Sequence, residues 1–300
     1  MAVIPKRILK DIAIFKRQLE ELNNSGIFCQ FTEENLLNAK AMIIGPSETP
    51  YENGYYFFDI WFPKDYPLNP PKVTFMNQDK RCRFNPNLYT NGKVCVSILG
   101  TWSGPGWTSC LNICSVLLSI QSLLNSRPIQ NEPGWENENG ARHLDYNNVV
   151  EYYNYHISMR DVLNKPIVGY EMFHPIMIDY FVKNFKNIYQ KLNQNIEEKD
   201  YKVVNSSIYS LSAVLNYTVL RDDLVDLYKK HKKDEDDSFL EQVVVVDKTE
   251  ISSSKTKSRK APNTPAKNFE LGFIMKSEND GNNYIVKGTN VKKWYKCKDQ

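Results

Sequence analysis

A cysteine and two asparagines lie close together in a turn-rich part of the chain, where their side chains could support acyl transfer. Asn87 ends the run Asn85-Pro86-Asn87 and precedes Cys95 by eight residues. A thiol can hold an acyl group as a thioester, and a side-chain amide can donate a hydrogen bond to the oxyanion that forms when an amine attacks. We therefore take Cys95 as the candidate nucleophile and Asn87 as the candidate oxyanion donor. The alternative for Asn87 is an Asx turn, in which its amide bonds only nearby backbone.

Cys95 stands between two valines, and by default such a cysteine is a small buried hydrophobic side chain. Because Asn91-Gly92 is a turn signal and residues 85–89 cannot form a regular element, we expect the thiol to be reachable from solvent. A cysteine protease needs a base beside its thiol, yet the histidines all follow residue 140 (His143, His156, His174 and His231). Exchange between thioesters needs less activation, since the attacking and leaving sulfurs have similar pKa values. The pattern favours thioester exchange.

A metal site is the other chemistry that the cysteines could provide. Cys110 and Cys114 share one helical face and could be combined with Cys82. Their apolar neighbours Ile113 and Leu117, and the lack of a nearby histidine, favour core packing over a zinc site. We predict no metal and no other cofactor.

Composition limits the class of protein. A chain of 300 residues with 41% hydrophobic and 12% aromatic residues can build one or two globular domains. The net charge of +3 is small and local, and no base-stacking motif accompanies it, so nucleic-acid binding is not expected. The six cysteines show no paired spacing, and no apolar stretch is long enough for a signal peptide or a membrane span. We expect an intracellular protein with free thiols, cytoplasmic with the nucleus left open, and no membrane partner.

The elements that must position the candidate site are predicted from periodicity. Apolar residues at spacings of three and four indicate an amphipathic helix over residues 5–23. Residues 27–44, 54–62 and 72–76 are typical of strands in an antiparallel meander, and in the second of these Tyr56, Phe58, Ile60 and Phe62 alternate with their neighbours. Prolines exclude residues 63–71 from a central strand, so this run is predicted to be an extended surface loop. A second helix is expected after a cap at Thr108 or Ser109, and Pro128 follows its end.

The rest of the chain divides into a helical part and a polar part. Helical patterns are expected over residues 145–164, 175–192 and about 205–230. After Lys229 the composition becomes charged and rich in Ser, Thr, Lys and Pro, which is typical of a disordered linker. The last thirty or so residues regain aromatic residues and are expected to fold back onto the body. We predict units at residues 1–165, 166–230, 231–268 and 269–300, the last of unknown role.

Several motifs together resemble one family. Gly45-Pro46-Ser47, the run from Pro63 to Pro71, Asn-Pro-Asn with Cys95, the sequence Gly-Thr-Trp at 100–102 and Asn-Glu-Pro-Gly at 131–134 are similar to those of ubiquitin-conjugating enzymes, above all the large Z-type branch. The resemblance covers residues 1 to about 195. It implies an α+β fold with an N-terminal helix, a four-stranded antiparallel meander, a central helix and a helical C-terminal extension. The family usually has His-Pro-Asn, so Asn85 stands where a histidine is expected; because asparagine also donates and accepts hydrogen bonds, we expect the loop to survive.

The resemblance implies an activity. A ubiquitin-conjugating enzyme accepts ubiquitin, or a ubiquitin-like protein, from an activating enzyme in an ATP-dependent pathway, here as a thioester on Cys95. It transfers the modifier to a substrate lysine, usually with a ligase. Asn87 would support the oxyanion or the loop, and Glu132 would orient the incoming amine; the alternative for Glu132 is a solvated loop acid. A further alternative is an inactive variant that serves as a ubiquitin-binding scaffold, and the C-terminal half could also be an independent interaction module.

The resemblance also implies partner surfaces. Basic residues of the first helix would meet the activating enzyme, and a solvated basic face is the alternative. A ligase would dock on the loop that holds Phe62 and on the loop after the cysteine. The implied partner residues are Lys6, Arg7, Lys10, Phe62, Trp102 and Pro105.

Overall fold

The structure, a computed structural model, describes residues 6–32, 35–232, 266, 269, 273–277, 282–287 and 293–296. Most of the predicted linker at residues 231–268 lies outside these residues. The predicted unit boundaries at residues 165, 230 and 268 stay predictions. No described helix is long and apolar enough to cross a membrane.

The N-terminal helix is present but consists of two pieces, α1 (Lys6–Arg17) and α2 (Leu19–Asn24). Ile8 and Phe15 of α1 are buried in the main hydrophobic core, as their spacing predicts. Asp11 of the same helix is also buried, and its carboxylate accepts hydrogen bonds from Arg7 and from the hydroxyl of Tyr66.

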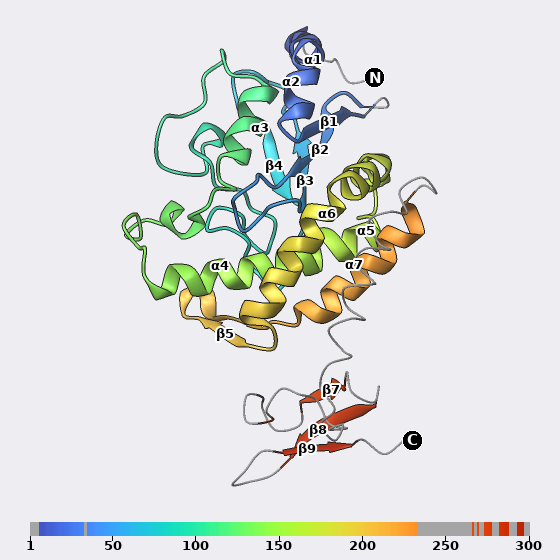
Figure 1. The fold of residues 1–300 in the computed structure, drawn as a ribbon. Coiled ribbons are helices and arrows are strands. Elements are labelled where there is room, and N and C mark those ends of the chain that lie inside the picture. Colours follow the sequence, from blue (N-terminus) through green and yellow to red (C-terminus); the bar gives the residue numbers. More distant parts are fainter. Residues whose placement is uncertain are drawn as a thin grey trace.

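The predicted four-stranded antiparallel meander is confirmed. Its strands are β1 (Ile27–Phe31), β2 (Asn38–Ile44), β3 (Tyr55–Trp61) and β4 (Lys72–Phe75), in the spatial order β1-β2-β3-β4 (Figure 1). The stretch predicted over residues 27–44 is therefore a hairpin of two strands, and Ile27 pairs with Ile43. Residues 63–71 form the predicted loop before β4.

Between β4 and the central helix the chain has little regular structure. The 3-10 turn η1 (Ser97–Leu99) follows Cys95 directly after Val96. The central helix α3 (Ile113–Gln121) starts later than predicted, because Asn112 is its cap and neither Thr108 nor Ser109 is. The Asn112 side chain accepts the backbone N–H groups of residues 114 and 115, which would otherwise lack partners. The 3-10 turn η2 (Pro128–Asn131) then leads to Glu132.

A helical extension follows, as predicted. It comprises α4 (Ala141–Tyr153), the π-helical η3 (Asn154–Asp161), α5 (Val162–Asn164), the 3-10 turn η4 (Glu171–Phe173), α6 (His174–Lys199) and α7 (Tyr217–His231). The prediction of one helix over residues 205–230 is wrong in its first part. There the chain forms a hairpin of β5 (Val203–Ser206) and β6 (Leu211–Val214), joined by the 3-10 turn η5 (Ile208–Ser210). β-Branched residues and a cluster of Asn and Ser disfavour a helix at this point.

The extension and the sheet share one hydrophobic core. The hydroxyl of Tyr55 on β3 donates to the carbonyl of Met177 on α6 at 2.9 Å. Asn154, the first residue of η3, accepts the hydroxyl of Tyr56 at 2.6 Å and donates to the carbonyl of Glu52 at 2.9 Å. Because these polar groups are buried and paired, the extension is held at one place against the sheet. Figure 1 shows α4, α6 and α7 grouped at one end of the sheet.

The described part of the C-terminal segment forms a small antiparallel sheet of β7 (Ile274–Lys276), β8 (Asn283–Lys287) and β9 (Lys293–Lys296) (Figure 1). Its own buried cluster includes Phe269, Met275 and Val286. Tyr201 and Val214 of the helical extension pack against this cluster, which agrees with the expectation that the segment folds back onto the body.

Candidate active site

Cys95 lies in an extended stretch that is hydrogen-bonded to the neighbouring backbone. Its N–H donates to the carbonyl of Asn87 at 2.8 Å, and Leu88 and Val94 form an antiparallel bridge beside it. Only 1% of the residue is exposed, so the expected solvent-accessible thiol is not present in this conformation. The physical reason is that this pairing folds the turn-rich stretch back on itself. Cys95 nevertheless stays outside the main hydrophobic cluster, which takes in Val94 and Val96 on either side.

The side chain of Asn87 lies against the cysteine. Its Nδ2 donates to the carbonyl oxygen of Cys95 at 2.8 Å. A side-chain amide carries two N–H donors, so one remains for another acceptor. Its Oδ1 is buried and has no hydrogen-bond partner within the described residues. The bond to backbone agrees with the alternative that the sequence left open, and it also holds an amide donor against the backbone of Cys95.

Asn85 holds in place the loop over residues 85–89, here called the motif loop, and its own side chain makes the Asx turn. Its Oδ1 accepts the N–H of Asn87 at 2.9 Å, and its Nδ2 donates to the hydroxyl of Tyr51 at 2.9 Å and to the carbonyl of Leu123 at 2.8 Å. The hydroxyl of Tyr51 in turn donates to the carbonyl of Phe84 at 2.6 Å. Asn85 is fully buried. Asn85 thus ties this loop to the segment after α3. This agrees with the expectation that the loop survives with asparagine in place of histidine.

Glu132 follows η2 and is half-buried. Its Oε2 accepts a hydrogen bond from the hydroxyl of Tyr209 at 2.6 Å. Among the described residues no hydrogen bond joins Glu132 to Cys95 or to Asn87. Tyr209 lies at the tip of the β5–β6 hairpin, and it was not predicted as a site residue because that stretch was predicted to be helical. No local sequence signal marks it.

Arg83 is a second residue near the site that was not among the predicted site residues. Its guanidinium carbon lies 3.9 Å from the ring centroid of Tyr89 and 4.0 Å from that of Tyr209. It also donates to the carbonyl of Pro86, the middle residue of the Asn-Pro-Asn motif, at 2.5 Å. Arg83 therefore connects the motif loop to the hairpin of the extension through cation–π contacts.

The other described cysteines are less suited to nucleophilic chemistry or lie elsewhere. Burial raises the pKa of the Cys29 and Cys82 thiols, and it raises the pKa of Cys114 to about 11. Since the thiolate is the nucleophile, these three are poor nucleophiles at neutral pH. Cys110 is exposed and precedes the Asn112 cap of α3.

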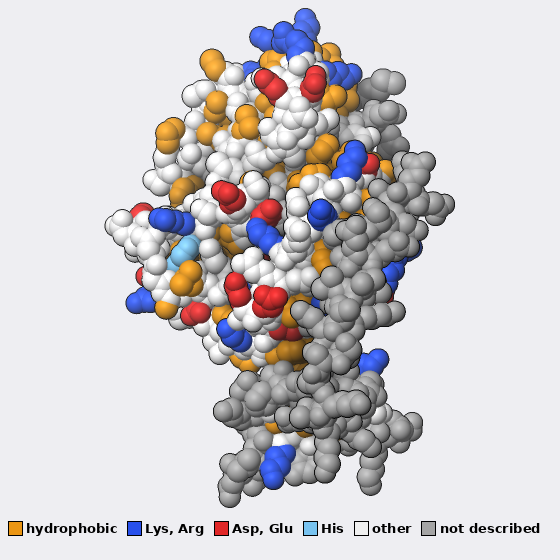
Figure 2. All heavy atoms as spheres, in the orientation of Figure 1, with side chains coloured by type: hydrophobic (Ala, Val, Ile, Leu, Met, Phe, Trp, Pro, Cys, Tyr) orange, Lys and Arg blue, Asp and Glu red, His pale blue; other side chains and the backbone are white. Residues whose placement is uncertain are grey.

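The structure divides the predicted basic surface. Lys6 and Lys10 are exposed on α1, and Figure 2 shows Lys and Arg side chains gathered at this end of the molecule. Arg7 instead pairs with Asp11 at 2.7 Å and donates to two carbonyl groups just before α3, those of residues 109 and 111. Arg7 therefore holds α1 against the start of α3, and its predicted role as a free partner-binding residue is corrected.

The predicted ligase-docking loop needs a similar correction. Phe62 is fully buried and stacks on Phe31 with ring centroids 6.0 Å apart, because it continues the inward alternation of β3. The exposed apolar side chain of this loop is Leu68, which is 80% exposed. On the loop after the cysteine, Pro105 is exposed and Trp102 is half-buried. Trp107 ties the two loops together, since its indole N–H donates to the carbonyl of Pro67 at 2.8 Å.

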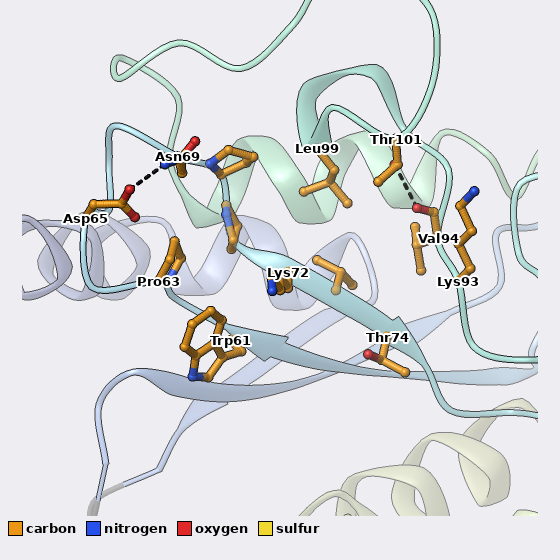
Figure 3. Close-up of a pocket in the computed structure, with 13 residues that line it drawn as sticks. Trp61, Pro63, Asp65, Asn69, Lys72, Thr74, Lys93, Val94, Leu99 and Thr101 are labelled. Carbon is orange, nitrogen blue, oxygen red and sulfur yellow. Dashed lines mark hydrogen bonds between the residues drawn. The ribbon is translucent and has the colours of Figure 1, made fainter.

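A cavity of about 670 Å³ lies between the Pro-rich loop, β4 and the segment over residues 93–101. Figure 3 shows Trp61 and Pro63 on one side of it and Leu99 and Thr101 on the other. Its walls do not include Cys95, Asn87 or Glu132. The cavity therefore lies beside the Pro-rich loop and is not the place where the candidate catalytic groups meet.

Comparison with known proteins finds similarity to ubiquitin-conjugating enzymes. A family model described as "Ubiquitin-conjugating enzyme" matches residues 7–156. Ubiquitin-conjugating enzyme E2 Z of Xenopus tropicalis is 33% identical over 203 residues, 62% of this chain and 65% of the relative. Ubiquitin-conjugating enzyme E2 Z of Homo sapiens is 43% identical over 143 residues, 46% of this chain and 40% of the relative.

A longer protein is similar over the same part of the chain. The dual E2 ubiquitin-conjugating enzyme/E3 ubiquitin-protein ligase BIRC6 of Homo sapiens is 41% identical over 142 residues, 45% of this chain and 3% of the relative. This chain thus spans between 40% and 65% of the two E2 Z relatives and only a small part of the third.

Proposed function

Because this chain belongs to the ubiquitin-conjugating enzyme family, of the Z-type branch, we propose that it carries ubiquitin or a ubiquitin-like protein as a thioester on Cys95 and passes it to a substrate lysine. The observation that carries the proposal is the hydrogen bond from Asn87 Nδ2 to the carbonyl of Cys95, which holds an amide donor against the backbone of the candidate nucleophile. An inactive scaffold would need neither group, so their contact disfavours that alternative.

The reaction takes two steps. In the first, the Cys95 thiolate attacks the carbonyl carbon of the thioester on the activating enzyme; a new C–S bond forms, the old one breaks, and the activating enzyme's sulfur leaves as a thiolate. In the second, the neutral lysine amine attacks the same carbon. A C–N bond forms, the bond to Cys95 breaks, the Cys95 thiolate is restored and the amine nitrogen loses a proton. ATP is consumed by the activating enzyme, so no cofactor is required here.

Three groups have roles in the second step. Asn87 supplies its remaining N–H to the oxyanion, Glu132 orients the amine and accepts its proton, and Asn85 keeps the motif loop in place. Cys95 must be a free thiol in order to accept the modifier, which suits an intracellular compartment.

The burial of Cys95 adds a requirement. A sulfur in a residue that is 1% exposed cannot bond to the C-terminal tail of another protein until the segments around it move. Cys95 is not part of the main hydrophobic cluster, so this movement need not open the core. We propose that the segments around Cys95 move apart when the activating enzyme, carrying the modifier as a thioester, docks.

The proposed partners are the activating enzyme, ubiquitin or a ubiquitin-like protein, a ligase and substrate proteins. Lys6 and Lys10, two exposed basic residues of α1, would meet the activating enzyme. Leu68, Trp102 and Pro105 form the proposed ligase-docking surface, and Leu68 replaces the buried Phe62 in it.

The test is a charging assay with activating enzyme, modifier and ATP, repeated across several activating enzymes and modifiers. The wild-type protein is expected to gain one modifier in a thiol-sensitive adduct. Cys95→Ala should remove this adduct, Cys95→Ser should leave a thiol-resistant ester, and the control Cys110→Ala should charge like the wild type. Persistence of the adduct in Cys95→Ala would overturn the assignment of the nucleophile, and no adduct with any pair would favour the scaffold.

A further inference from the structure

The turn of the β5–β6 hairpin has a costly backbone conformation. Tyr209 and Ser210 are consecutive non-glycine residues with φ of 56° and 52°. Left-handed backbone is unfavourable for such residues and persists only where the surroundings hold it, so it often marks a functional position. Contacts of the Tyr209 side chain hold this residue in place.

The side chain of Tyr209 reaches two parts of the proposed active site. Its hydroxyl donates to Glu132 Oε2 at 2.6 Å, and its ring lies 4.0 Å from the guanidinium carbon of Arg83. Arg83 in turn contacts Tyr89 and donates to the carbonyl of Pro86, so it belongs to the motif loop. Tyr146 of α4 supports the Tyr209 ring edge-on, with centroids 6.0 Å apart. A residue of the extension thus braces both the candidate acid and the loop that precedes the cysteine.

We propose that Tyr209 is a positioning residue, whose hydroxyl holds the Glu132 carboxylate in the orientation that receives the lysine amine. This inference rests on the proposed role of Glu132. A carboxylate has about four acceptor positions on its two oxygens, so one bond from Tyr209 fixes the group without using up its capacity. A hydrogen bond to a charged group is among the stronger ones, which makes it suited to selecting one rotamer.

The Tyr209 hydroxyl can donate its hydrogen bond to Glu132 at neutral and mildly alkaline pH. Burial, and the hydrogen bond to Glu132, raise the pKa of Tyr209 well above its usual value. The hydroxyl therefore stays protonated, and the contact does not switch off between neutral and mildly alkaline pH. The helical extension, by this account, contributes a group to amine transfer and is more than a structural addition.

The experiment starts from protein already charged on Cys95 and follows loss of the thioester to two nucleophiles. Free lysine needs the carboxylate, whereas a small thiol such as glutathione attacks without it. Tyr209→Phe keeps the ring over Arg83 and removes only the hydroxyl. We expect discharge to lysine to slow roughly 10-fold, as for the loss of one charge-assisted hydrogen bond, with discharge to the thiol unchanged.

Tyr153→Phe is the matched control. Its hydroxyl donates to the carbonyl of Ser212 in the same hairpin at 3.2 Å and does not touch Glu132. This variant should discharge to both nucleophiles like the wild type. If it slows lysine discharge as much as Tyr209→Phe does, or if Tyr209→Phe slows both nucleophiles alike, the effect is loss of hairpin structure and the inference is overturned.

A double-mutant cycle separates this inference from the proposed function. With Glu132→Ala already in place, Tyr209→Phe should slow lysine discharge no further, since it acts through Glu132. Further slowing in that background would contradict the inference. If Glu132→Ala slows discharge but Tyr209→Phe does not, the inference alone fails. If Glu132→Ala has no effect, the role of Glu132 is wrong and the inference falls with it.

Discussion

Replacing Asn85 by aspartate alters the hydrogen bonds beneath the motif loop with almost no change of shape. The side-chain Nδ2 donates to Leu123 O at 2.8 Å and to Tyr51 Oη at 2.9 Å, and a carboxylate oxygen in its place would face two acceptors. The hydroxyl of Tyr51 already donates to the carbonyl of Phe84, so it could donate to the carboxylate only by giving up that bond. The bonds that Oδ1 accepts, from the Asn87 N–H at 2.9 Å and from Asn131 Nδ2 at 3.5 Å, would be kept, and the Leu123 carbonyl would keep its bond from Asn131 Nδ2 at 3.2 Å.

The magnitude follows from these two losses. Each of the two lost donations leaves a buried carboxylate oxygen facing an acceptor, at a cost of about 1–3 kcal/mol, so the two together predict a loss of about 4 kcal/mol in the free energy of unfolding at about pH 8. When the introduced carboxyl is protonated it regains one donor, which can serve the Leu123 carbonyl, and about half of the loss should be recovered.

The pH dependence has a definite sign. Protonation is favoured in the folded state, so the pKa of the introduced group is raised above its unfolded value. The folded protein then binds more protons than the unfolded one, and the deficit relative to wild type is full above the folded pKa and shrinks as pH falls through it. The recovery is complete only below the unfolded carboxyl pKa of about 3.9, so urea unfolding at about pH 8 and about pH 5 should show the deficit shrinking by roughly 0.7 kcal/mol.

Asn205→Asp is the control, because it adds the same charge at an exposed hairpin position where Oδ1 can still accept the Ser212 hydroxyl at 2.8 Å. It should change stability by less than about 0.5 kcal/mol at either pH. A deficit for Asn85→Asp that is absent, or that grows on acidification, would show that the hydrogen bonds assigned to Asn85 do not hold the loop.

Three further predictions concern the site and its support. Asn87→Ala should charge normally but discharge to lysine about 10²–10³-fold more slowly, measured by single-turnover assay; discharge at the native rate would remove Asn87 from the mechanism. Iodoacetamide should label Cys110 faster than Cys95 in the free protein, as read by peptide mass spectrometry, because Cys110 is exposed and Cys95 is buried; faster labelling of Cys95 would contradict the closed site. Gly54→Ala would place a Cβ 1.8 Å from the Oδ1 of the asparagine that begins η3, so urea unfolding should show a loss of about 3 kcal/mol or more, whereas Gly106→Ala, with open space around it, should show little change.

Much of the fold could be predicted from local patterns. The alternation of β3, the apolar stripe of the first helix and the prolines before β4 each determine a local conformation, because the periods of strands and helices are set by backbone geometry. The Asn-Pro-Asn motif and Cys95 likewise predicted which side chains lie together, since they are joined by a short turn-rich stretch that leaves them few alternatives. The contact between Asn87 and the backbone of Cys95 is the outcome.

Burial and long-range partners were decided only by the tertiary structure. Cys95 is covered, Phe62 faces inward, and Arg7 is occupied by carbonyl groups more than a hundred residues away in the chain. Tyr209 meets Glu132 across 77 residues, from a hairpin that the sequence pattern did not distinguish from a helix. A residue's own neighbours determine its local conformation, but which distant segment packs over it depends on the free energy of the whole folded chain.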